Sequence, residues 1–318
     1  MADKPVVVVG DANVDMVIRL PDRSGKTKPD LTQSVPQLFG GGSAANVAVA
    51  LARLGARTSF IGAVGDDGYG RFARDDLARE GIDVAGVRVI SDAFTPMVIA
   101  MIEPSGERLN VVWPPERGAD NRLTPDDIDP NVIAGAAWLH TTGMCLRASP
   151  VRDAVLRAMM LARTANAQVS LDLNLRLELW GWRDGIRETI DQAIALADVV
   201  FGSAEEEIAP VARVASVEAA ARLLAGGRRI VVARRGSQGA LAATPDGIVR
   251  APAFRTTVVD TLGAGDAFDG GFIAARLIGK SVEEALRWGN AVAALQIAQP
   301  GARGLPTRAE VERLLAKE

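Results

Sequence analysis

Residues 260–268 read DTLGAGDAF, and this stretch sets an acid, Asp266, in the first turn of an expected helix. The residues that follow carry apolar side chains at helical spacing as far as Gly279, so one stripe packs inward while the helix N-terminus faces a cleft. Unpaired N–H groups at such an N-terminus suit a phosphate. A carboxylate beside a phosphate is unfavourable unless it takes a proton from an attacking hydroxyl. The stretch therefore indicates phosphoryl transfer to an alcohol.

Size and composition favour a globular protein that acts on small molecules. The chain has 318 residues, of which 48% are hydrophobic, so it can bury a large α/β core. A formal net charge of -3 gives no basic field for nucleic acid, and no apolar run approaches the roughly 18 residues of a membrane span. The single cysteine, Cys145, fits a reducing compartment. We expect a cytoplasmic protein with no nucleic-acid and no membrane partner.

Short β-rich runs alternate with longer helical patterns along the chain. Residues 6–9 precede a helical pattern at 43–54, and residues 168–172 precede another at 185–197. This alternation predicts an α/β fold with a doubly wound, mostly parallel sheet flanked by helices. The run at 6–9 is apolar without alternation, as expected for a central strand covered on both faces.

Two segments, about 12–38 and 93–117, interrupt the alternation with short β-like pieces and turns. Both emerge at the carboxyl ends of early strands, where ligands bind in open α/β sheets. We predict that they form a small β-sheet lid within a single domain spanning 1–318. Surface loops are the alternative interpretation of these segments.

A second glycine cluster, GGGSAAN at residues 40–46, opens the first long helix. Alone it is a weak signal, because glycines before a helix can simply form a tight turn. Its value comes from Asn13 and Asp15, which follow the first strand and share one face. A carboxylate accepts hydroxyl hydrogen bonds, an amide donates and accepts them, and glycine lets a sugar approach the backbone. The group indicates a polyol site.

More familiar nucleotide folds do not fit. A dinucleotide-binding fold needs a GxGxxG motif directly after a strand, but only Gly10 follows the first strand. The P-loop is nearly imitated by GKT at 25–27, yet Leu20 stands where its first glycine belongs. A protein kinase is excluded because the only histidine, His140, is not followed by Arg-Asp. We expect His140 to be a packed core residue.

These residues together carry a resemblance. Gly41-Gly42 with Asn46, and residues 260–268, resemble the two signature regions of the PfkB (ribokinase-like) carbohydrate kinases. DLNLR at 172–176 and GSQGA at 236–240 are also similar, so the resemblance covers nearly the whole chain. It implies a ribokinase-like fold and an ATP-dependent sugar kinase that transfers the γ-phosphate of ATP to a hydroxyl of a small sugar.

The resemblance also implies site residues. Asp266 is similar to the family's catalytic base, and Gly263, Ala264 and Gly265 to its backbone anion hole. The positions similar to the sugar-binding residues are Asn13, Asp15, Gly41, Gly42, Asn46 and Arg176. Those similar to the nucleotide-binding residues are Ser203, Arg234, Gly236, Gly239 and Asn290.

Metal ions enter through the same resemblance. Glu206 falls where the family has a glutamate that organises Mg²⁺ and the phosphates through water, and an ion held mainly by phosphates needs few protein ligands. The loop at 299–306 resembles one that encloses a potassium ion near Asp260. Gly304 stands where a serine often contributes an oxygen, which leaves activation by K⁺ open.

The sequence says less about which sugar accepts the phosphate. The candidates are sugars of the fructose, ribose and 2-keto-3-deoxygluconate types. Ser43 replaces a lysine typical of ribokinases, whereas DLNLR followed by Leu179-Trp180 resembles fructokinases and ketodeoxygluconate kinases. An acidic sugar would need a lid cation such as Arg108 or Arg117. We favour a neutral sugar. The alternatives are a nucleoside kinase of the same family and a catalytically silent sugar or nucleotide sensor. We expect a homodimer formed by pairing of two lids.

Overall fold

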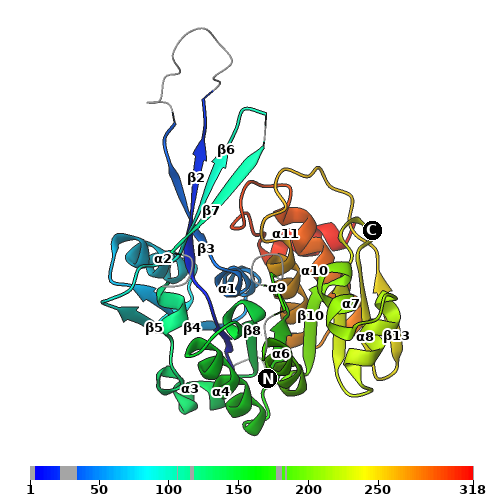
Figure 1. Ribbon diagram of the computed structural model, residues 1–318. Coiled ribbons are helices and arrows are strands. Elements are labelled where there is room, and N and C mark those ends of the chain that lie inside the picture. The colour runs from blue at the N-terminus through cyan, green and yellow to red at the C-terminus, as the bar shows by residue number, and fades with distance from the viewer. Residues whose placement is uncertain are drawn as a thin grey trace.

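The computed structural model describes residues 4–21, 34–105, 107–114, 118–176, 181–182 and 185–317. Three segments used above, residues 25–27, Arg117 and Leu179-Trp180, lie outside the described residues, as does the side chain of Arg108. The described part forms a large sheet covered by helices on both faces, with a smaller sheet standing off one edge (Figure 1). The predicted α/β architecture is confirmed.

The large sheet is nine-stranded and parallel except at one edge, where β12 and β13 run antiparallel to their neighbours. β1 lies between β8 and β4, and its four valines are fully buried, because helices cover both of its faces. In spatial order the strands are β13 (Gly247–Ala251), β12 (Ala240–Thr244), β11 (Ile230–Arg234), β10 (Val199–Ser203), β9 (Gln168–Asp172), β8 (Trp138–Thr142), β1 (Val6–Val9), β4 (Thr58–Gly65) and β5 (Asp83–Ile90).

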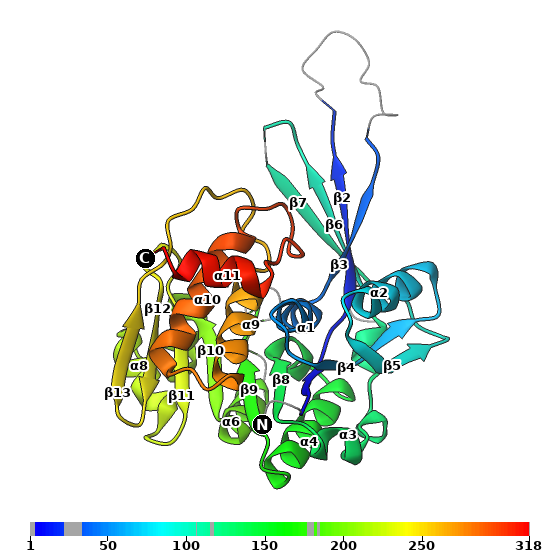
Figure 2. The same cartoon turned by 180° about the vertical axis from the view of Figure 1, so that it is seen from behind.

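The helices bury their apolar faces in two cores, one on each face of the sheet. The first core holds residues of α1 (Ser43–Arg53), α2 (Gly68–Arg79), α9 (Ala264–Leu277), α10 (Val282–Gln296) and α11 (Arg308–Leu315). The second holds residues of α3 (Pro130–Ala134), α4 (Val151–Thr164), α6 (Ile186–Leu196), α7 (Ala209–Ala212) and α8 (Val217–Ala225). α1 and α9 lie side by side in both views (Figure 2), which brings the front and back of the chain together. None of the described helices is long and apolar enough to cross a membrane.

Helix starts follow the capping signals in the sequence. Ser281 with Glu284 forms a reciprocal capping box at α10, and Thr307 with Glu310 forms another at α11. Thr124 and Asp127 form a further capping box, but it opens a 3₁₀ turn, η3 (Pro125–Asp127), and α3 begins only at Pro130. His140 is fully buried in β8, with its Nδ1 2.9 Å from the Ser170 hydroxyl, as expected for a packed core residue.

The smaller sheet has four strands in the order β3 (Gln37–Gly41), β2 (Asn13–Arg19), β6 (Met97–Ile102) and β7 (Arg108–Trp113). β2 pairs with β6 in parallel, although 84 positions separate Asn13 from Met97, so the pairing joins the two interrupting segments. Figures 1 and 2 show the strands rising away from the large sheet above α1. A separate small sheet at this place agrees with the prediction.

Candidate active site

The centre of the site is the first turn of α9, where Asp266 lies. The chain enters this helix through Gly263, whose φ of 78° is left-handed and favours glycine. A side chain there would also collide with the loop after α10, because an added Cβ would come within 2.7 Å of the Ala302 Cβ. The tight turn lets the N-terminus of α9 approach the edge of the sheet.

The carboxylate of Asp266 is held by α1. The Ser43 hydroxyl donates to Oδ1 at 2.7 Å, and the Asn46 amide donates to Oδ2 at 2.8 Å. The Asn174 amide, at the end of β9, donates in turn to the Ser43 hydroxyl at 2.8 Å. Three hydrogen bonds from two other elements therefore fix the orientation of this acid.

Burial raises the pKa of Asp266 to about 7, against the two hydrogen bonds from Ser43 and Asn46, which lower it. The nearby charges of Asp172 and Asp11 raise it further. A carboxylate with a pKa near neutrality is a stronger base than an exposed one and still ionises at physiological pH. This is the property that a general base for a hydroxyl requires.

The N-terminus of α9 has no side-chain cap. The first N–H groups of a helix lack intrahelical partners, and they carry the positive end of the helix dipole. The N–H of Ala264 donates to the backbone oxygen of Thr261 at 3.2 Å, and the turn places the backbone of Gly263 and Gly265 next to Asp266, an arrangement that fits an anionic phosphate.

The polyol half of the site forms where β2 meets β3. Their register sets Asn13 opposite Gly41, with Asp15 two residues further along the same face. A Cβ on Gly41 would lie 2.2 Å from Asn13 Oδ1 and 2.6 Å from Asp15 Oδ1. Glycine keeps this space free, so the backbone and two polar side chains border one small cradle.

Two acceptors in this half are unused. Asn13 Oδ1 and Asn46 Oδ1 are buried, and neither has a hydrogen-bond partner among the described residues. Buried acceptors without donors cost about 1–3 kcal/mol each, so they are normally satisfied by a ligand or water. Hydroxyl groups of a sugar would supply the missing hydrogens.

Asp11 is a member of the site that the sequence did not reveal. It is 6% exposed, and its two carboxylate oxygens accept the N–H groups of Ser43 at 2.8 Å and Ala44 at 3.1 Å. It thus caps α1 from the end of β1, while Gly42, with a φ of 97°, forms the turn. An acid directly after a strand and opposite a glycine turn is the signal that could have identified it.

Arg176 lies at the rim of the site. Asn174 and Arg176 take left-handed φ values of 32° and 46°, which are rare for residues other than glycine. Such conformations collect at functional turns. The turn exposes Arg176, while the amide of Asn174, which is 9% exposed, points back at Ser43.

Arg234, expected near the adenine, extends its guanidinium beneath α9. It donates to Asp172 at 2.8 Å, to Asp269 at 2.7 Å and to the backbone oxygen of Gly265 at 3.3 Å. Burial lowers the pKa of Arg234, but the charges of Asp172, Asp269 and Glu207 hold it well above its usual range. The sequence analysis missed this ion-pair cluster, which fixes the first turn of α9 to the ends of β9 and β11.

A π-helical turn, η5 (Ala204–Ile208), separates two neighbouring acids. Glu207 is buried and accepts the N–H groups of Ser203 at 2.7 Å and Leu175 at 2.8 Å. Glu206 instead receives the Ser203 hydroxyl at 3.3 Å on the exposed side. Within the described residues, no group of three histidine, cysteine or acidic side chains could hold a metal ion by itself.

The remaining expected nucleotide residues lie beside β12 and β13. Gly236 and Gly239 have left-handed φ values of 53° and 85°, and a Cβ on Gly239 would come within 2.1 Å of the Ala251 oxygen. The Asn290 amide, on α10, donates to the backbone oxygens of Ala251 and Pro252 at 3.1 and 2.9 Å. These residues keep the last hairpin close to α10, and their contact with adenine stays a prediction.

The loop at 299–306 lies against the turn that precedes α9. Asp260 accepts the Gly301 N–H at 3.1 Å and the Leu262 N–H at 3.0 Å. Gln296, which is fully buried on α10, donates to the backbone oxygens of Leu262 and Gly301, both at 2.9 Å. Gln296 was missed by the sequence analysis because a lone glutamine carries no local signal.

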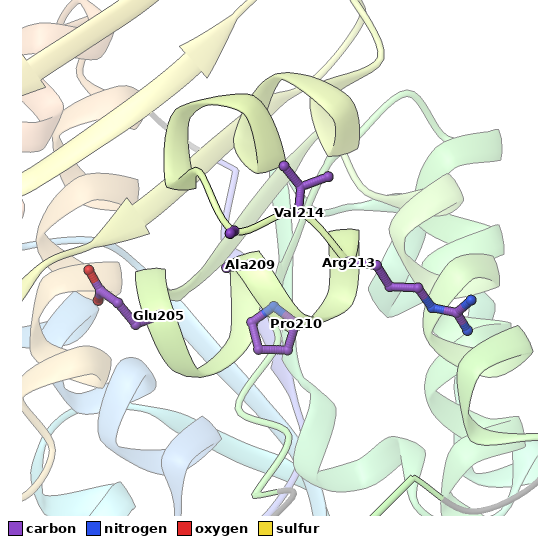
Figure 3. Close-up of a pocket in the computed structure, with 6 residues that line it drawn as sticks. Glu205, Ala209, Pro210, Arg213 and Val214 are labelled. Carbon is purple, nitrogen blue, oxygen red and sulfur yellow. The ribbon is translucent and has the colours of Figure 1, made fainter.

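A shallow hollow lies beside η5 and α7, apart from the residues described so far. Its lining residues are Glu205, Ala209, Pro210, Arg213, Val214 and Ala215. Figure 3 shows Glu205 and Arg213 extending away from each other on opposite sides of the hollow. The hollow therefore does not gather charge, and we assign no chemistry to it.

An acid in the first turn of an uncapped helix, facing a polar cradle, is the arrangement expected of a phosphotransferase that acts on a small polyol. The model of the "pfkB family carbohydrate kinase" matches residues 3–308. Fructokinase from Klebsiella pneumoniae is 38% identical over 269 residues, 84% of this chain and 82% of its own. ATP-dependent ribose-1-phosphate kinase from Halopiger xanaduensis is 35% identical and covers 98% of both chains.

Among solved structures, a double mutant of fructokinase from Vibrio cholerae O395, with fructose, ADP and a potassium ion bound, superposes with a TM-score of 0.84. It is 30% identical and covers 99% of each chain. The chain belongs to the pfkB family of carbohydrate kinases. It is a sugar kinase of ribokinase-like fold.

Proposed function

We propose that this kinase transfers the γ-phosphate of ATP to a hydroxyl of a small neutral sugar, with Asp266 as the general base. The observation that carries the proposal is the position of Asp266. Its carboxylate, with a pKa of about 7, lies between the open N-terminus of α9 and the unused acceptors of Asn13 and Asn46. The oxygen of the sugar hydroxyl attacks the phosphorus of the γ-phosphate of ATP, ADP leaves, and the hydroxyl proton passes to Asp266.

The backbone of Gly263, Ala264 and Gly265 stabilises the charge that develops on the transferred phosphoryl group. Mg²⁺, when bound, neutralises the triphosphate and takes most of its ligands from phosphate and water. Glu206, which accepts the Ser203 hydroxyl on the exposed side of η5, is the residue that would hold that water shell. The relative that is named ATP-dependent and the ADP-bound fructokinase support the choice of nucleotide.

A monovalent cation is supported by the loop at 299–306. Asp260 already joins this loop to the anion-hole turn through Gly301, and the fructokinase from Vibrio cholerae contains a potassium ion. We propose that K⁺ binds between Asp260 and this loop and stabilises the turn.

A neutral acceptor is supported by the charges that line the cradle. Asp11 already occupies the N-terminus of α1, the place where an acidic substituent would otherwise be attracted. Asp15 and Asp266 would repel a sugar carboxylate as well. The intact, anchored base also argues against a catalytically silent sensor, which has no use for it.

The decisive experiment is a panel assay with Mg-ATP against fructose, ribose, 2-keto-3-deoxygluconate, gluconate and adenosine, which scores both ADP release and the phosphorylated product. We expect the highest kcat/KM with a neutral sugar. Preference for adenosine would favour the nucleoside kinase, and binding without transfer would favour the sensor. Higher kcat/KM with the two acids would contradict the neutral acceptor.

The small sheet serves as the lid of this site and as a dimer surface. Residues of β7 expose apolar side chains on one face, namely Leu109, Val111 and Trp113. Pairing of two such sheets would bury them and cover the edge strands, so we propose a homodimer in the cytoplasm, where the single cysteine stays reduced. Sedimentation at micromolar concentration should give twice the chain mass.

A further inference from the structure

Arg303, in the loop at 299–306, reaches across the site to the glycine turn that borders the sugar cradle. Its Nε donates to the backbone oxygen of Gly40 at 3.0 Å, and its Nη1 donates to that of Ala45 at 3.1 Å. These two carbonyls flank Gly41 and Gly42 on either side. A single guanidinium therefore clamps the end of β3 to the start of α1.

The clamp is buried and built into its surroundings. The side chain of Arg303 is 13% exposed, and its Nη2 faces Asp76 Oδ2, on α2, at 3.7 Å. That oxygen is buried without a hydrogen bond among the described residues. An added Cβ on Gly40 would come within 2.1 Å of Asp76 Oδ2 and 2.9 Å of Arg303 Nη2, so the glycine at this position makes room for both members of the pair.

The backbone around Arg303 is fixed as well. Arg53, on α1, donates to the backbone oxygens of Arg303 at 3.2 Å and Leu305 at 2.7 Å, and it pairs with Glu80 at 2.6 Å. A long side chain held at both ends loses little further entropy when a ligand binds. Arg303 is thus a rigid connection and not a surface charge.

The other side of the same loop contacts the anion hole. Ala302 lies against Gly263, whose absent Cβ would come within 2.7 Å of it. Gly301 donates to Asp260, at the start of the DTLGAGD turn. The loop is therefore packed between the phosphate-binding turn and, through Arg303, the sugar-binding turn.

We propose that Arg303 is a positioning residue that couples the two halves of the site, so that a nucleotide bound at α9 orders the sugar cradle at Gly41. The coupling is reciprocal: a bound sugar tightens nucleotide binding by the same factor. Gly42, with its left-handed φ, gives the turn freedom, and the two hydrogen bonds from Arg303 restrain it only as firmly as the loop at 299–306 is itself held; a nucleotide at the adjoining α9 turn would hold that loop more firmly. The inference rests on the proposed sites for nucleotide and sugar.

The test replaces Arg303 by Met, which keeps most of the apolar stem but removes both donors, and by Lys, which keeps the charge without the fork. The control is Arg308→Met, which removes an exposed arginine paired with Glu312 at 2.8 Å on α11. We expect Arg303→Met to raise KM for the acceptor sugar about tenfold or more, with kcat within about threefold of wild type. Arg303→Lys should recover part of the loss, and Arg308→Met should match wild type.

A second measurement needs no turnover. Mg-ADP should slow amide hydrogen exchange of residues 39–46 in the wild-type protein and in Arg308→Met, and it should have less than half that effect in Arg303→Met. Equal protection of this segment in all three proteins would overturn the coupling. So would a parallel fall of kcat and of the melting temperature with sugar KM unchanged, because that pattern belongs to a general structural role. Failure of the proposed function would appear separately, as wild-type protein that phosphorylates no acceptor.

Discussion

The N-termini of α1 and α9 point at the same site, but their backbone N–H groups are capped in one helix and not in the other. The N-terminus of α1 is neutralised within the protein, because Asp11 accepts the N–H groups of Ser43 and Ala44. The N-terminus of α9 has a left-handed Gly263 at its start and no side-chain cap. Both begin with glycine turns, so the glycines alone do not distinguish them.

The difference explains how one cleft separates a charged ligand from a neutral one. An uncapped helix end attracts an anion, and a capped one does not. On the proposed function, the phosphate of the nucleotide would be drawn to α9, while the start of α1 is left with short polar side chains that suit hydroxyl groups. Asp266 lies between the two helix ends, because it belongs to α9 but is held by two side chains of α1, Ser43 and Asn46.

The largest effect is expected from Asp266→Asn, which removes the base but leaves both helix ends in place. Asn cannot take the hydroxyl proton, so kcat should fall by about 10²- to 10⁴-fold. Mg-ADP affinity should change little, because the backbone donors of α9 remain. Stopped-flow or steady-state kinetics with the best acceptor and calorimetric titration of Mg-ADP would check both statements. Turnover near that of wild type would exclude the proposed base.

A smaller change in kcat/KM should follow from a change of pH alone. The pKa of Asp266 is raised to about 7 by burial, so the group is protonated below that pH and cannot accept a proton from the sugar. The kcat/KM for the sugar should therefore rise from acidic pH to a plateau above neutrality, and at pH 6 it should be about tenfold below that plateau. A profile with its acidic limb near pH 4 would mean that Asp266 is not buried in the working enzyme.

The smallest effect tests the cap itself. Asp11→Ala should lower the free energy of unfolding by about 0.5–2 kcal/mol, because two N–H groups of α1 lose their acceptor. The freed helix end should also bind anions, so that sulfate inhibits competitively against the sugar.

The matched control for this variant is Asp67→Ala. Asp67 caps α2 by accepting the Gly70 N–H at 2.7 Å, away from the cradle. Asp67 also accepts the N–H and the hydroxyl of Thr95, both at 2.9 Å, so its loss should cost at least as much stability in urea unfolding as the loss of Asp11, but without any sulfate effect. Equal sulfate inhibition of both variants would contradict the role of Asp11 as the group that keeps anions from the sugar side.

The alternation of strands and helices predicted the sheet, and the two interruptions predicted the smaller one, because both depend on local periodicity. The glycine turns at 40–42 and 263–265 were also predicted, since glycine spacing and a following helix are short-range signals. Asn13, Asp15 and Gly41 could be grouped in advance because the first two follow the carboxyl end of the first strand and Gly41 stands in the glycine turn that opens the first long helix.

The residues that hold the site together were not predictable in this way. Ser43 meets Asp266 across 223 positions of sequence, and Arg303 meets Gly40 across 263. Gln296 and Asp269 are single polar residues inside apolar helices, where no spacing reveals their partners. Arg234 shows the same limit, because the family resemblance implied a nucleotide contact whereas its guanidinium extends to the acids under α9.

The hydrogen bond between Asn46 and Asp266 has a consequence for synthesis. The two residues are 220 positions apart, and a ribosome adds about 5–20 residues per second, so their translation is separated by on the order of 10–40 seconds. During that interval α1 already carries the polar groups that will orient the base, but the base does not yet exist. On the proposed mechanism, the growing polypeptide therefore lacks its general base until Asp266 is made, and the site would be completed when α9 packs beside α1.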